Sequence, residues 1–132
     1  MKYLLDTNIC IHFFKGKYNL AEKIETEGIN NCAISEITLA ELVFGAENSL
    51  HPEKNHKIVE IFTKQVTILP IYDSIRIYGK EKARLRKSGT MISDFDLLIG
   101  STSVEKDLIM VTENVGEFDR ISNIKIENWI KR

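Results

Sequence analysis

Three acidic residues stand where short apolar stretches give way to helices, which is where side chains of an α/β protein commonly do chemistry. Asp6 follows the apolar run Tyr3-Leu4-Leu5, and Glu41 lies in the second turn after a helix start at Ser35. Asp96 lies in the first turn of a later helix. Because a parallel sheet gathers its strand-to-helix connections along one edge, we expect the three carboxylates to lie together there.

Carboxylates gathered within a few ångströms repel one another, and this repulsion raises their pKa values unless a cation neutralises them. The expected cation is Mg²⁺, or Mn²⁺ in its place, because hard divalent ions take oxygen ligands. His12, His51 and His56 lack the spacing of zinc ligands. A Mg²⁺ ion held by carboxylates suits phosphate chemistry, since it polarises a phosphate, lowers the pKa of a bound water and orients in-line attack.

Each acid also has a purely structural interpretation. Asp6 is placed to cap the helix that follows it, and Glu41 fits a solvated helix face. The segment Ser93-Asp94-Phe95-Asp96 fits a capping box, in which Asp96 serves the start of its own helix. The joint occurrence of three acids on such connections is what favours a site.

The rest of the chain alternates short apolar strands with amphipathic helices, a pattern typical of α/β proteins. The expected strands are residues 3–5, 32–34, 66–69, 108–111 and 124–126. The expected helices are residues 9–14 with Asn8 as cap, 20–27, 35–45, 53–64, 72 or 73 to 87, and 93–106. This order predicts a parallel sheet covered by helices on both faces.

Length and composition indicate one globular domain without a global affinity for nucleic acid. The chain has 132 residues, of which 43% are hydrophobic and 28% charged, and its net charge is −1. Any surface for RNA or DNA must therefore be local. Cys10 and Cys32 lie in apolar runs, which favours two reduced, buried thiols over a disulfide. No stretch approaches the roughly 20 apolar residues that span a bilayer, so we expect a cytoplasmic protein without membrane contact.

Four segments taken together resemble a known family. They are Leu5-Asp6-Thr7-Asn8, Thr38-Leu39-Ala40-Glu41-Leu42-Val43-Phe44-Gly45-Ala46, Asp94-Phe95-Asp96-Leu97-Leu98-Ile99 and Val111-Thr112-Glu113-Asn114. In this order and spacing, residues 1–132 resemble a single PIN domain, and more narrowly the VapC toxins of bacterial type II toxin–antitoxin modules. The resemblance implies a three-layer α/β/α fold with a five-stranded parallel sheet. It also implies a Mg²⁺-dependent endoribonuclease that leaves 5′-phosphate and 3′-hydroxyl ends.

The resemblance assigns roles to individual residues. Asp6 matches the first metal ligand, Glu41 the second, directly or through water, and Asp96 the third. Thr7 and Thr112 match hydroxyl positions beside the metal, and Asn8 matches a residue that orients the first loop.

The fourth acidic position of the family is the poorest match. Many relatives have Asp where this chain has Asn114, and Glu113 and Glu117 are nearby substitutes. An amide still donates and accepts hydrogen bonds but adds no charge, which leaves the number of metal ions open.

Two groups of basic residues are candidates for contact with RNA. Lys15 and Lys17 follow the first helix. The longer series lies on the helix expected before residue 88, and comprises Lys80, Lys82, Arg84, Arg86 and Lys87. Its alternative interpretation is a solvated helix face balanced by Glu81. Within the resemblance, segments 47–50 and 52–55 favour initiator tRNA, cut in the anticodon loop, as the substrate.

The family also implies partners. A cognate VapB-like antitoxin is expected to bind the toxin as a hetero-oligomer and to place an arginine on the acids. The apolar residues Ile11, Phe13, Phe14 and Tyr18 lie in and after the first helix and are candidates for its groove, although most of them are expected in the core. A homodimer is expected from the family alone.

Three other functions are alternatives to the nuclease. A phosphatase of the haloacid dehalogenase type needs a second Asp two residues after Asp6, where Asn8 stands. A receiver domain needs an Asp at the end of the third strand, where Leu69-Pro70-Ile71 stands. The remaining alternative is a non-catalytic PIN-like module that binds RNA or protein, and the presence of all three acids disfavours it.

Overall fold

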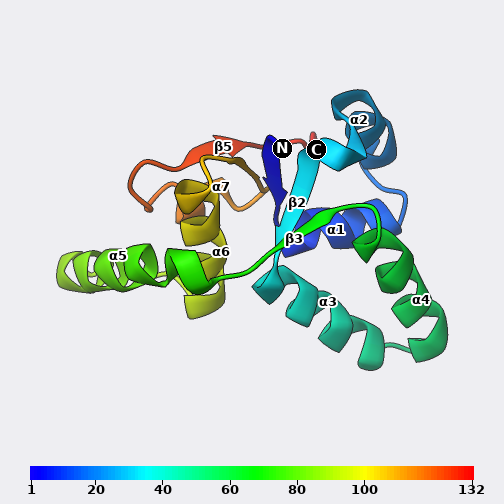
Figure 1. Ribbon diagram of the computed structural model, residues 1–132, viewed down its shortest axis with the longest axis horizontal. Coiled ribbons are helices and arrows are strands. Elements are labelled where there is room, and N and C mark those ends of the chain that lie inside the picture. Colours follow the sequence, from blue (N-terminus) through cyan, green and yellow to red (C-terminus); the bar gives the residue numbers. More distant parts are fainter.

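The fold is a parallel five-stranded sheet with β1 at its centre, described by a computed structural model of residues 1–132. The strand order is β3-β2-β1-β4-β5, and each neighbouring pair is parallel. The strands are β1 (Tyr3–Leu5), β2 (Cys32–Ser35), β3 (Thr67–Leu69), β4 (Ile109–Val111) and β5 (Lys125–Glu127). Figure 1 shows β1 and β2 between the two groups of helices.

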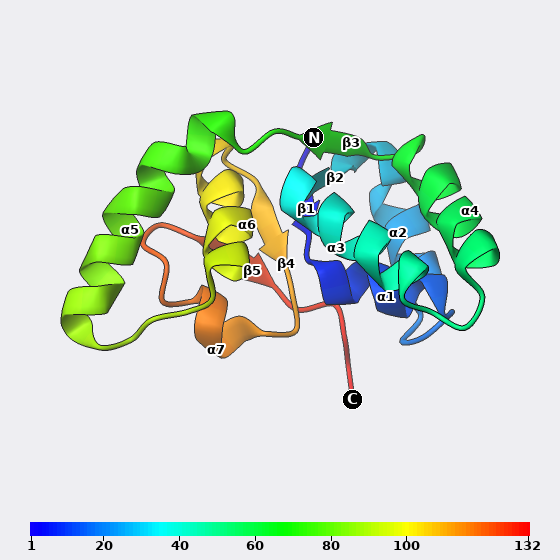
Figure 2. The same cartoon turned by 90° about the horizontal axis from the view of Figure 1, so that it is seen from below.

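Helices cover both faces of the sheet, as the alternating pattern predicts. Figure 2 shows α1 to α4 on one side of the strands and α5 to α7 on the other. The first group is α1 (Thr7–Phe14), α2 (Leu20–Glu27), α3 (Glu36–Glu47) and α4 (Pro52–Thr63). The second group is α5 (Ile75–Ser88), α6 (Asp94–Glu105) and α7 (Val115–Phe118). Two short 3₁₀ helices, η1 (Ile29–Asn31) and η2 (Tyr72–Ser74), complete the chain.

Successive residues of each central strand belong to two separate cores. Tyr3 and Leu5 pack in the core under α1 to α4, and Leu4 packs in the core under α5 to α7. Met110 of β4 likewise faces one core while Val111 faces the other. This alternation explains why β1 reads as an uninterrupted apolar run, since both of its faces are buried.

Several element boundaries differ from the sequence-based expectation. The helix expected from residue 9 with Asn8 as cap begins at Thr7, because the carboxylate of Asp6 accepts a hydrogen bond from the Thr7 amide and takes the cap position. The single helix expected from residue 72 is divided into η2 and α5. The short helix α7 was not expected, and its four residues are too few to show a hydrophobic period.

A buried acid ties α5 to the loop between α7 and β5. Glu81 is 5% exposed, and its carboxylate accepts hydrogen bonds from Arg84 Nη2 (2.9 Å) and Nε (3.0 Å) and from the Ser122 amide. Arg84 also donates to the carbonyl of Arg120 (2.6 Å). The bonds from Arg84 are the main reason why the pKa of Glu81 falls to about 2.

Cys10 and Cys32 are both buried, and both are free thiols. Burial raises the pKa of each thiol, so neither is activated as a nucleophile. None of the helices has the combination of length and hydropathy that a membrane crossing requires.

Candidate active site

The site begins at the end of the central strand, where β1 passes directly into α1. Asp6 occupies this junction and is 5% exposed. Its Oδ1 accepts a hydrogen bond from the Thr7 amide (2.8 Å), and its Oδ2 accepts one from Thr112 Oγ1 (2.7 Å). Burial raises the pKa of Asp6 in spite of these two bonds, and the charge of Glu41 adds to the rise. The carboxylate is therefore held in one orientation while its charge remains poorly solvated.

Glu41 is connected to the same junction through a hydroxyl. Thr7 Oγ1 donates to Glu41 Oε1 (2.7 Å) and lies 3.1 Å from the hydroxyl of Thr38. Thr38 is fully buried one turn before Glu41 on α3, so both present polar groups to the start of α1. Sequence reasoning missed Thr38, although its spacing of three residues from Glu41 on one helix face is the signal that identifies it.

Asp96 enters the site from the start of α6. The Oγ of Ser93 caps this helix by accepting a hydrogen bond from the Asp96 amide (3.2 Å), which confirms the cap that the sequence predicts. The pKa of the Asp96 carboxyl rises to about 6, first because it is desolvated and then because Asp6, Glu117 and Glu41 surround it with negative charge. Asp96 therefore belongs to the same electrostatic cluster as the other two acids.

The three carboxylates are neighbours, but the structure does not assemble them into a finished metal cage. No group of three or more His, Cys, Asp or Glu side chains is arranged to hold a metal ion. Glu41 is turned to Thr7 instead, and both oxygens of Asp6 are engaged by protein donors. The donor set still fits Mg²⁺ or Mn²⁺ chemically, because it offers carboxylate and hydroxyl oxygens. None of the three carboxylates forms a salt bridge with a cation of the protein.

Three residues lie at or near the fourth acidic position of the family: Asn114, Glu113 and Glu117. The side-chain Nδ2 of Asn114 donates to Glu117 Oε2 (3.0 Å), and the backbone N–H of Asn114 donates to Thr112 Oγ1 (2.9 Å). Glu117 contributes to the raised pKa of Asp96, whereas Glu113 is bonded to Arg132. Of the two substitutes expected from the sequence, Glu117 is thus the one that acts on the cluster electrostatically.

A small polar hollow of about 210 Å³ opens above Asp6. It is lined by Asp6, Asn8, Glu113 and Asn114. Asn8 is exposed at the rim of this hollow, and Asp6, not Asn8, caps α1.

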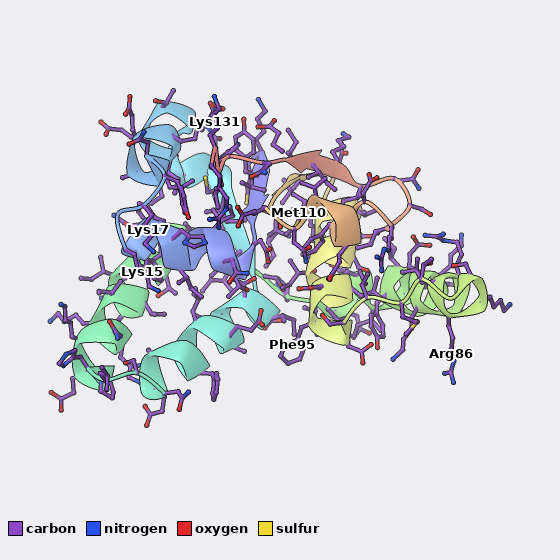
Figure 3. The ribbon with its side chains drawn as sticks, turned by 180° about the vertical axis from the view of Figure 1, so that it is seen from behind. Lys15, Lys17, Arg86, Phe95, Met110 and Lys131 are labelled. Carbon is purple, nitrogen blue, oxygen red and sulfur yellow. The ribbon has the colours of Figure 1, made fainter.

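The basic residues predicted to contact RNA lie in two separate places. Lys15 and Lys17 are exposed just after α1, whereas Arg86 lies far away on α5 (Figure 3). Lys80 and Lys87 are also exposed on α5. Lys82 and Arg84, in contrast, are engaged within the protein.

Lys82 pairs with Asp94 (2.8 Å) and contacts the Tyr78 hydroxyl (3.2 Å). Arg84 is held by Glu81 and by the carbonyl of Arg120. The α5 series is therefore partly the internally balanced helix face that the sequence left as an alternative.

A second, mostly apolar hollow lies between α1, α3 and α4, and it reaches Glu41. Its volume is about 310 Å³. Ile11 and Phe14 line it, as the sequence predicts for a groove beside the first helix. Phe13 and Tyr18 do not, because Phe13 stacks with Phe62 and Tyr18 packs edge-on against the ring of His12.

Comparison with known proteins identifies this arrangement. The family described as PIN domain matches residues 3–124. A tRNA(fMet)-specific endonuclease VapC from Salmonella typhimurium is 38% identical over 131 residues, which cover 98% of each chain. Ribonuclease VapC2 from Haemophilus influenzae is 35% identical over 98% of this chain and 99% of its own length.

Solved structures agree with the sequence relatives. The chain superposes on DNA-bound VapBC from Salmonella typhimurium with a TM-score of 0.91 at 37% identity, covering 98% of both chains. A fold centred on β1, three acids around its carboxyl end and near full-length relatives above 30% identity lead to one conclusion. The chain belongs to the VapC family of PIN-domain ribonucleases.

Proposed function

We propose that this chain is the endoribonuclease toxin of a type II toxin–antitoxin module and hydrolyses RNA at the Asp6, Glu41 and Asp96 cluster. The observation that carries the proposal is the fixed orientation of Asp6, a buried acid held by Thr112 and Thr7 although burial raises its pKa. A buried carboxylate that lies near Glu41 and Asp96 and has no cation among its partners costs stability, and a function that uses this charge accounts for the cost. Initiator tRNA is the first substrate to test, because the Salmonella relative is a tRNA(fMet)-specific endonuclease.

We assign these residues different roles in phosphodiester hydrolysis. Asp6 and Asp96 would hold a Mg²⁺ or Mn²⁺ ion, with Glu41 as a ligand directly or through water. When bound, such an ion polarises a phosphate and lowers the pKa of water.

Thr112 and Thr7 keep Asp6 and Glu41 from rotating away, which preserves the geometry that in-line attack needs. Glu117 adds negative charge beside Asp96 and is fixed by Asn114. Attack of water on phosphorus with departure of the 3′ oxygen leaves 5′-phosphate and 3′-hydroxyl ends.

The experiment compares the wild-type chain with Asp6→Asn on an initiator tRNA transcript, with and without EDTA. The expected result is cleavage by the wild type that requires Mg²⁺, with 5′-phosphate ends, and none by the variant. Asp73→Asn is the matched control, because Asp73 on η2 is an exposed acid, and it pairs with Lys106 (3.0 Å). Full activity of a folded Asp6→Asn preparation would refute the assignment. Binding of tRNA by the wild type without cleavage would support the non-catalytic module.

We also propose that a VapB-like antitoxin binds this chain, as in the solved VapBC complexes of its relatives. The antitoxin would bind in the apolar hollow between α1, α3 and α4, because a segment bound there contacts Ile11 and Phe14 and reaches Glu41. The family further suggests a homodimer and action in the cytoplasm, where the tRNA substrate is found. Size-exclusion chromatography with light scattering, with and without the antitoxin, tests the assembly.

A further inference from the structure

Arg132 is attached to the rim of the active site by a paired interaction with Glu113. Its Nη2 donates to Glu113 Oε1 (3.0 Å), and its Nε donates to Oε2 of the same carboxylate. The pair lowers the pKa of Glu113 and raises that of Arg132, so both groups stay charged. Parallel bonds of this kind fix the plane of the guanidinium as well as its position.

A second contact holds Arg132 from the side. Its guanidinium carbon lies 5.1 Å from the centre of the Tyr18 ring, within cation–π range. Tyr18 in turn meets the ring of His12 edge-on, with ring centres 5.1 Å apart. The arginine is thus positioned by Tyr18 of the α1–α2 connection and by Glu113 of the β4–α7 connection.

This position matters because of what surrounds it. Glu113 lines the same hollow as Asp6, Asn8 and Asn114. Arg132 is the one cation hydrogen-bonded to a residue of that lining. An RNA strand that approaches Asp6 meets several negative charges, so a cation at this rim has a direct electrostatic use.

The guanidinium keeps donors free for a second anion. Glu113 takes one N–H of Nε and one of Nη2, which leaves the Nη1 edge unused, and the side chain is 61% exposed. A planar guanidinium offers two parallel N–H donors on each of two edges, and on the edge that is free here, that of Nη1 and Nη2, their spacing matches two oxygens of a phosphate. We propose that Arg132 binds a backbone phosphate of the RNA substrate beside the scissile bond, and that Glu113 positions it for that contact.

This inference rests on the proposed nuclease function, and its test separates the two. Binding is measured by fluorescence anisotropy of a labelled initiator tRNA transcript in an Asp6→Asn background, and cleavage kinetics are measured in the parent chain. The variants are Arg132→Ala and Arg132→Lys. Lys125→Ala is the matched control, because Lys125 is equally exposed and pairs with Asp107 (2.7 Å) at the opposite end of β5 from the segment that carries Arg132.

We expect Arg132→Ala to weaken tRNA binding and to raise KM about fivefold to tenfold, with kcat little changed. The dependence of log affinity on log salt should fall by about one. Arg132→Lys should recover only part of the loss, since an ammonium cannot bind two oxygens in a plane. Lys125→Ala should bind as the parent does.

A double-mutant comparison distinguishes contact with RNA from mere neutralisation of Glu113. If Arg132 touches phosphate, Arg132→Ala weakens binding in the Glu113→Gln background as well. If Arg132 only cancels the charge of Glu113, the effect disappears in that background, and the proposal is overturned. Parent-like binding by Arg132→Ala also overturns it. A parent chain that binds tRNA without cutting it refutes the nuclease function alone, because the binding comparison at Arg132 can still be made.

Discussion

Neutralising Asp96 should make the protein more stable and less active at the same time. In the structure, Asp96 is partly buried near Asp6, Glu41 and Glu117, and its pKa rises from 3.8 to about 6. An acid whose pKa is higher in the folded state stabilises the fold when protonated. That contribution is complete below its unfolded pKa near 3.8 and is lost as the pH rises through about 6.

The size of the effect follows from the shift. A change of about two pKa units corresponds to about 3 kcal/mol, and the partial exposure of Asp96 reduces this figure to about 2 kcal/mol through solvent screening. Asp96→Asn keeps the shape of the side chain and removes the charge. Near pH 7, its free energy of unfolding should therefore exceed that of the wild type by about 2 kcal/mol. At a pH near 4, the two proteins should be about equal, because Asp96 is then largely protonated.

Urea denaturation in EDTA, followed by circular dichroism at both pH values, measures this difference. Millimolar Mg²⁺ should then stabilise the wild type more than the variant, because a cation that binds the folded state shifts the unfolding equilibrium. Cleavage of the tRNA transcript by the variant should be lost. A variant that is less stable than the wild type near pH 7, or equally stabilised by Mg²⁺, would show that Asp96 is a structural capping residue and refute the reasoning.

Three further predictions concern groups around the site. Glu81→Gln should lower the free energy of unfolding by about 3 kcal/mol near pH 7. Denaturation at lower pH should show that this deficit shrinks between pH 4.5 and about pH 2, because a lowered pKa stabilises the fold only while the acid is charged. Thr112→Val removes the donor to Asp6 and the acceptor of the Asn114 amide, and should cost about 1–3 kcal/mol in urea denaturation and slow single-turnover cleavage. Replacing Lys15 and Lys17 by Ala should raise KM and reduce the salt slope by about two, whereas Arg84→Ala should alter stability and leave that slope unchanged.

The strand that carries Asp6 was predictable because both of its neighbours are strands and both of its faces are buried. These conditions require an uninterrupted apolar run, and a charged residue then marks the strand end. Asp96 was predictable for a similar local reason, since Ser93 supplies a helix cap next to it. The parallel order of the strands then brought these acids to one edge, as expected.

Long-range side-chain pairing was not predictable in the same way. Arg132 and Glu113 are 19 residues apart, and no periodic pattern connects them. The division of the helix expected from residue 72 into η2 and α5 also escaped the sequence. The buried hydroxyl of Ser74 there bonds to the carbonyl of Ile71 (2.8 Å), which favours a local turn over a continuous helix.

The position of β1 also bears on the order in which the site assembles as the chain is synthesised. Asp6 is synthesised 106 residues before Thr112, whose hydroxyl holds its Oδ2, and β1 completes its pairing only when β4 arrives. Joining segments so distant in sequence is slow, because a long loop must close before the contact repays its entropy. Until Thr112 has been synthesised, a growing chain carries Asp6 without the hydroxyl that holds its Oδ2. The site therefore cannot form before β4 and Thr112 have been synthesised.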